Sequence, residues 1–131
     1  MSGFTKRNLR AEVEDSAVKF GMSDVLEAHF ARDALEATQS GISLLQVKPN
    51  QRVPFGHTHD KQEEVYVVVG GSGRLKLDDE VVDVGRWDAV RMAPEVTRGV
   101  EAGPDGLDIV AFGAPNTGLG DANQEMGWWS D

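Results

Sequence analysis

Turn-forming glycines and prolines constrain the fold of this chain most strongly, because they interrupt it every few residues between positions 42 and 113. The segments between these turns are apolar, or alternate between apolar and polar residues with the period of a β-strand. We predict strands or extended segments over residues 42–48, 52–59, 63–69, 74–78, 81–84, 88–92, 97–101 and 107–112. Short strands at this spacing are typical of an all-β sandwich or barrel.

The two ends of the chain are less regular, and we divide it into an arm, a barrel and a tail. The arm, residues 1–41, has mixed structure: residues 25–35 fit a helix capped by Ser23 and Asp24, whereas residues 26–30 also alternate like a strand. The barrel covers residues 42–113, and the tail, residues 114–131, contains Trp128 and Trp129. Two adjacent tryptophans are costly in water, so we expect the tail to pack on the barrel or on a partner.

Composition excludes several classes of function. The chain has 131 residues, which suits one domain, and a net charge of −9, with its only basic cluster at Lys6, Arg7 and Arg10. Nucleic-acid binding needs a basic surface, and a membrane span needs roughly 20 apolar residues, so neither partner is expected. The chain contains no cysteine and its start lacks the apolar core of a secretory signal. We therefore expect a cytoplasmic protein.

Two of the three histidines, His57 and His59, lie two residues apart in a predicted strand. Side chains at this spacing point to the same face of a strand. A short polar turn at residues 60–62 then leads into the next strand, which begins with Glu63 and Glu64. Two imidazoles and one carboxylate form a ligand set that suits Fe(II), Mn(II), Ni(II) or Zn(II) and leaves coordination positions open for a substrate.

The segment Gly56-His57-Thr58-His59, with Glu64 following and a glycine-rich turn at residues 70–73, resembles the first motif of the cupin superfamily. The six residues between Glu64 and Gly71 match the spacing of that motif, which favours Glu64 over Glu63 as a ligand. Residues 85–98 resemble the second cupin motif more loosely. The resemblance spans most of residues 42–113 and implies a double-stranded β-helix barrel that holds a divalent metal ion through His57, His59 and Glu64.

The sequence departs from the cupin pattern at two positions. Gln51 replaces the glycine that usually opens the first motif, and Arg98 replaces the histidine that usually supplies a fourth metal ligand. A guanidinium stays protonated and cannot ligate a metal. Arg98 therefore has two interpretations: it clamps an anionic group of a substrate, or it pairs with Glu64 where a metal would lie. Tyr66 shares the face of Glu64, so it should line the cavity, as a hydrogen-bond donor to substrate or as a wall residue.

The resemblance implies a metal-dependent enzyme of the oxygenase, isomerase or lyase type, acting on a small, anionic molecule with Tyr66 and Arg98 as catalytic residues. One alternative is a non-catalytic barrel that binds a small ligand through the same two residues without a metal. Another is a structural barrel that docks on a partner through its tail or its outer sheet. The outer positions Val65, Val67 and Val69 are too apolar for solvent, so we expect a homodimer.

Overall fold

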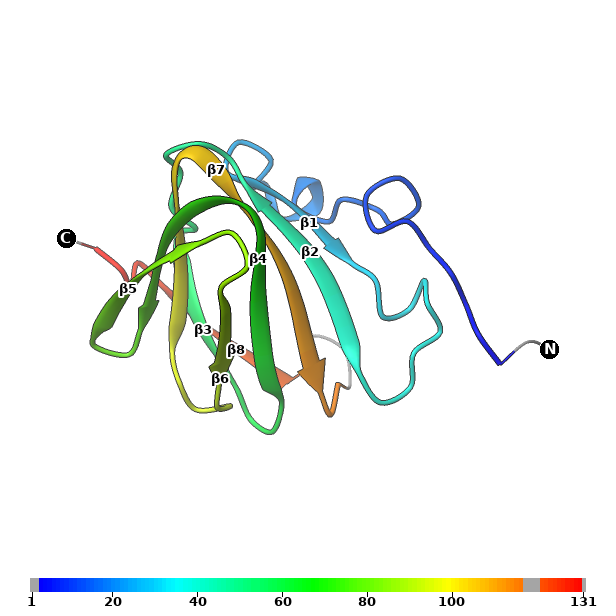
Figure 1. Cartoon of the computed structure of the whole chain (residues 1–131). Coiled ribbons are helices and arrows are strands. Elements are labelled where there is room, and N and C mark those ends of the chain that lie inside the picture. Colours follow the sequence, from blue (N-terminus) through cyan, green and yellow to red (C-terminus); the bar gives the residue numbers. More distant parts are fainter. Residues whose placement is uncertain (1–2, 117–120, 131) are drawn as a thin grey trace.

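The computed structural model describes residues 3–116 and 121–130, and their regular secondary structure is almost entirely β-strand (Figure 1). One turn of 3-10 helix, η1 (Val18–Phe20), precedes the first strand. The strands are β1 (Leu26–Phe30), β2 (Gly41–Val47), β3 (Phe55–His59), β4 (Glu63–Leu77), β5 (Glu80–Gly85), β6 (Ala89–Met92), β7 (Arg98–Ala114) and β8 (Ala122–Met126). The predicted all-β class is confirmed.

The eight strands form one antiparallel sheet that curls around a core (Figure 1). The hydrogen-bonded order is β1-β2-β7-β3-β8, and β4 pairs with β5, β6 and β7. Strands β1 and β8 therefore end the main path of the sheet. Side chains at alternate positions of β4 and β7 point inward, and the most deeply buried apolar ones are Tyr66, Val68, Leu75, Leu107 and Ile109. This curled wall places the inner faces of β3 and β4 next to each other.

Strands β4 and β7 are longer than the sequence predicts. The predicted breaks at residues 70–73 and 102–106 are wrong, because β4 pairs with β7 from Glu63 opposite Ala114 to Leu77 opposite Arg98. The pairing shifts register on either side of Gly71, which has φ 71°. A side chain at this position would collide with the backbone of Gly106. The glycines here bend the strands and do not end them, as expected of bulges at the corners of a barrel.

The N-terminal arm adopts the strand alternative and forms β1 where a helix over residues 25–35 was the other possibility. Strand β1 pairs with β2, and this pairing selects the strand over the helix that the local sequence also permits. The Asp15 carboxylate accepts hydrogen bonds from the backbone of Ala17 at 3.0 Å and of Ala28 at 2.9 Å. The buried His29 ring lies 2.8 Å from the Val13 carbonyl oxygen through its Nδ1. These contacts fix the arm along the edge of the sheet.

The C-terminal tail packs on the barrel, which is one of the two predicted alternatives. Strand β8 pairs with β3 along its whole length. Trp129 is 8% exposed and lies under the guanidinium groups of Arg52 and Arg74, at 4.3 and 5.3 Å from the ring centroid. Such cation–π contacts stabilise an aromatic ring at the surface. No helix in the described part of the chain is long and apolar enough to span a membrane.

Candidate metal centre

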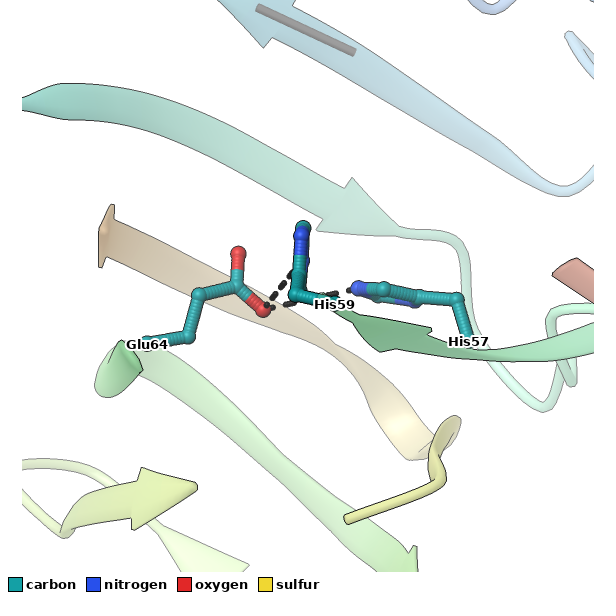
Figure 2. A group of neighbouring side chains, drawn as sticks. All are labelled: His57, His59 and Glu64. Atoms are coloured by element: carbon teal, nitrogen blue, oxygen red, sulfur yellow. Dashed lines mark ion pairs between the residues drawn. The ribbon is translucent and has the colours of Figure 1, made fainter. Parts of the chain in front are cut away.

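The two histidines of β3 and the glutamate near the start of β4 point toward one another (Figure 2). The Nε2 atoms of His57 and His59 each lie 3.4 Å from Oε1 of Glu64. One ligand atom from each residue lies within 4.8 Å of the others. The two imidazoles meet edge to face, with ring centroids 5.0 Å apart. The structure thus brings together the three residues that the sequence predicts as ligands.

The chemistry and spacing of these atoms fit a divalent metal ion. Two ligand atoms that each lie at 2.0–2.1 Å from one ion are roughly 2.9–3.4 Å apart, close to the separations of both imidazoles from Glu64. The Nε2 atom of His59 is buried and has no hydrogen-bond partner among the described residues. A buried polar atom without a partner is costly unless a ligand satisfies it. A metal ion bound by His57, His59 and Glu64 would satisfy it.

A group of polar side chains holds the other side of the His59 ring. Its Nδ1 lies 3.0 Å from the amide nitrogen of Gln62 and 3.6 Å from Oδ2 of Asp121. The Asn116 amide donates to Oε1 of Gln62 at 2.7 Å. Binding of a metal by Nε2 places the proton on Nδ1, and the Asp121 charge favours this tautomer. With the Gln62 and Asn116 amide groups turned the other way, Gln62 would accept the proton of Nδ1 and donate to Asn116, so both hydrogen bonds would be kept.

The Glu64 carboxylate is partly buried and remains ionised. Burial raises its pKa, but the neighbouring His57 and His59 side chains lower it by more, so the net pKa lies well below the ordinary value for a glutamate. An ionised carboxylate is the form that ligates a metal.

Arg98 is 1% exposed and pairs with Glu64, the second of the two arrangements considered from the sequence. Its Nη1 donates to Oε1 of Glu64 at 2.8 Å. Its Nη2 donates to the carbonyl oxygens of Ala93 at 2.8 Å and Val96 at 2.9 Å, and its Nε donates to Val96 at 3.1 Å. The guanidinium has five N–H groups, so these contacts leave little capacity for a bidentate substrate clamp. A catalytic role for Arg98 stays a prediction.

Tyr66 lies two residues after Glu64 on β4, so the two side chains point to the same face, and Tyr66 is 2% exposed. Burial raises its pKa well above the ordinary value, the Glu64 charge raises it further, and the Arg98 charge offsets part of the increase. The phenol therefore stays protonated at neutral pH and is available as a hydrogen-bond donor, not as a base. Its predicted role in catalysis is not tested by this arrangement.

One cavity of about 690 Å³ contains the candidate centre. His57, His59, Glu64, Tyr66 and Arg98 all border it. The remaining lining comes from the arm, β1, β2, β7 and β8 and is mostly apolar. A cavity of this size suits a small organic molecule, which would lie against the three ligand residues.

The fold and this site can be compared with known proteins. The sequence matches no family model and none of the curated proteins. A cupin protein from Bacteroides fragilis superposes with a TM-score of 0.71 over 91% of this chain and 90% of its own, at 22% identity. This protein has the cupin fold.

Two further solved structures are similar to this chain. A protein with a double-stranded β-helix domain from Klebsiella pneumoniae has a TM-score of 0.71 at 16% identity, over 91% of this chain and 95% of its own. A variant of Streptomyces PAC13, solved with uridine, has a TM-score of 0.74 at 16% identity, over 93% of this chain and 92% of its own. At such identities the likeness establishes the fold alone, and the predicted double-stranded β-helix is confirmed.

The structure adds three residues to the site that the sequence analysis missed: Gln62, Asn116 and Asp121. Gln62 could have been predicted from strand alternation, because it lies two residues before Glu64 and therefore on the same side of the chain. Asn116, two residues after β7, contacts Gln62, and Asp121, just before β8, lies beside His59. No local pattern in the sequence marks either of them.

Proposed function

We propose that this cupin binds one divalent transition-metal ion through His57, His59 and Glu64 and is a metal-dependent enzyme acting on a small molecule in its barrel. The convergence of three ligand atoms within 4.8 Å at the wall of a cavity of about 690 Å³ carries this proposal. The unsatisfied Nε2 of His59 supports it, because that atom is buried and points at the same position. An iron, manganese, nickel or zinc ion each suits the ligand set.

When bound, such an ion supplies a Lewis acid with open positions for substrate. The chain itself supplies the rest of the site. Gln62 and Asp121 orient His59, Glu64 stays ionised beside both imidazoles, and the Tyr66 phenol offers a proton-bearing group to the cavity. The mostly apolar lining of the cavity favours replacing water by a bound molecule. The reaction belongs to the oxygenase, isomerase or lyase types for which a positioned neutral donor is useful.

Metal content tests the proposal directly. We expect untagged protein purified without chelator to contain about one equivalent of a transition metal by elemental analysis. The double variant His57→Ala, Glu64→Gln should contain none, because two of the three ligands are removed. Glu63→Gln is the matched control, since Glu63 is the exposed neighbour and pairs with Arg91 on the surface. Protein that is isolated empty and takes up no added iron, manganese, nickel or zinc would refute the metal centre.

The pair between Arg98 and Glu64 favours a second candidate function, a metal-free barrel that binds a small ligand. Here the guanidinium 2.8 Å from Oε1 of Glu64 provides the positive charge that a metal would otherwise provide. Under this alternative, ligand-induced thermal stabilisation survives treatment with a chelator and vanishes in Arg98→Ala. Under the metal-dependent function, the same stabilisation is lost with the ion.

A further inference from the structure

The cavity beside the candidate centre has two chemically different parts. Its polar part is formed by His57, His59, Glu64 and Tyr66. Its apolar part is formed mainly by buried or half-buried side chains of β1, β2 and β7, among them Leu26, Ala28, Leu45, Val47 and Val100. A molecule that fills the cavity must therefore place an apolar body against these side chains.

Apolar side chains also border the cavity where it meets solvent. Phe20, Phe30 and Met126 line it and are 59%, 37% and 70% exposed. They come from the arm, from β1 and from β8, and β1 and β8 are the two ends of the main sheet path. Large apolar side chains grouped around an opening are typical of a binding site for an apolar molecule.

The charges around the cavity disfavour an anion. The guanidinium groups among the described lining residues belong to Arg98 and Arg32. Arg98 is engaged by Glu64 and by backbone carbonyls, and Arg32 donates to the Asn116 carbonyl at 3.2 Å and to Asp33 at 3.0 Å. Each of these guanidinium groups is paired with a carboxylate, Glu64 or Asp33, which offsets its attraction for an anionic ligand. The net charge of −9 adds a repulsive field.

We propose that the cavity binds a neutral molecule with a flat or compact apolar body and oxygen atoms at one end, with those oxygens facing His57, His59 and Glu64. A neutral ligand differs from the anionic molecule that the sequence predicts from Arg98. The preference for an apolar body rests on the cavity walls, whereas the preference for terminal oxygens rests on the proposed metal centre.

Naphthol and naphthoate test this inference, because they share one ring system and differ in charge. Uridine is the polar neutral comparison. We expect isothermal titration of metal-loaded protein to give naphthol a dissociation constant at least about tenfold lower than those of naphthoate and uridine. Tighter binding of naphthoate would overturn the inference of a neutral ligand, and tighter binding of uridine would overturn that of an apolar body.

Cavity-filling variants locate the binding. Ala111 is buried on β7 opposite Tyr66 and borders the cavity, so Ala111→Leu extends into the space that the ring would occupy. Ala28→Leu fills it from β1. We expect either variant to weaken naphthol binding at least about tenfold, while Ala89→Leu, on the exposed face of β6, leaves it unchanged. Unchanged binding in both cavity variants, with circular dichroism confirming that they are folded, would overturn the assignment of this cavity.

The same titrations separate this inference from the proposed function. Protein that takes up no metal but binds naphthol in the cavity supports the apolar site and refutes the metal centre. Protein that holds its metal but binds no naphthol refutes the apolar site and leaves the metal centre intact.

Discussion

Arg98 determines the balance of charge at the centre of the barrel. Its guanidinium is buried, lies 2.8 Å from Oε1 of Glu64 and is held by backbone carbonyls from residues 93–96. The sequence left two orientations open, because the carbonyls that select one of them belong to a loop whose conformation no residue pattern encodes. The structure therefore adds a cation to a site that the sequence predicts as two imidazoles and a carboxylate.

Replacing Arg98 by a neutral residue should make the free energy of unfolding depend more strongly on bound metal. In Arg98→Met, Glu64 loses its partner, and breaking a buried pair from one side costs about 3–5 kcal/mol. We expect chemical denaturation to show this loss without metal and a larger recovery on adding zinc or manganese than in the wild type, because the ion replaces the lost charge. Arg91→Met, which breaks an exposed pair with Glu63, should cost no more than about 1 kcal/mol. Equal stabilisation by metal in Arg98→Met and in the wild type would contradict this account.

Gly113 should affect metal affinity indirectly, through Gln62, which contacts His59 and not the metal. A β-carbon at this position would overlap the Gln62 side chain, which lies 3.0 Å from Nδ1 of His59. We expect Gly113→Ala to displace Gln62 and weaken metal binding by roughly 10–100-fold, the usual effect of losing the partner of a ligating histidine. Competition with a chromogenic chelator measures this change. Gly85→Ala is the control, since open space surrounds Gly85, and an equal effect there would refute the role of Gln62.

The three ligand candidates could be predicted because their relation is local. Residues two apart on a strand share a face, and a short turn brings the next strand alongside, so the sequence places Glu63 or Glu64 near His57 and His59. The resemblance to the first cupin motif then favours Glu64. Two of the residues behind His59 could not be predicted in this way, because only the path of the sheet brings Asp121 to His59 and Asn116 to Gln62.

At the scale of elements, one carboxylate joins the turn between β3 and β4 to the start of β8. The Oδ1 of Asp121 accepts hydrogen bonds from the backbone N–H groups of Asp60 at 2.7 Å and Lys61 at 3.1 Å, and its Oδ2 accepts one from Gln62 at 2.9 Å. Burial raises the pKa of Asp121, but these backbone donors and the charge of His59 lower it by more, so the net pKa is below the ordinary value.

The lowered pKa of Asp121 predicts how its contribution to the stability of the protein depends on pH. Because the folded pKa lies below the unfolded one, Asp121 stabilises the protein fully above pH values near 4, and this contribution is lost as the pH falls through the folded pKa. We expect Asp121→Asn to lower the melting temperature by a few degrees at pH 7. Calorimetry should show the difference between the two proteins shrinking below about pH 4. A difference that is constant down to pH 2 would indicate that the Asp121 charge plays no part.

Strands next to a clear turn signal were predictable, whereas the corners of the barrel were not. The β2 and β3 positions follow from the predicted Pro-Asn turn, where Asn50 has φ 61°, and from the extended backbone that Pro54 favours before it. The glycines at 70–73 and 102–106 look like strand ends in the sequence, because glycine permits both a turn and a bulge. Only the pairing of β4 with β7 over their full length distinguishes the two.

At the scale of the whole molecule, the outer face of the sheet carries a continuous apolar strip. Val65 on β4 lies opposite Phe112 on β7, which in turn lies opposite Ile42 on β2. A second outward-facing row is formed two residues further along β4, where Val67 lies opposite Val110 and Val110 opposite Leu44. Phe112 is 45% exposed. The strip includes Val65 and Val67, two of the positions from which the sequence predicts a homodimer, and a second copy of the same face would cover it.

We therefore predict that Phe112→Lys converts a dimer to a monomer in sedimentation velocity experiments, because the lysines of two facing copies would repel one another and bury unpaired charge. Phe4→Lys is the matched control: Phe4 is 80% exposed on the arm, away from the strip, and its replacement should leave the dimer intact. Each copy carries a net charge of −9, so raising the salt concentration should strengthen association of the wild type by screening the repulsion between copies. A wild-type protein that sediments as a monomer at all salt concentrations would contradict the homodimer and show that the strip is tolerated in water.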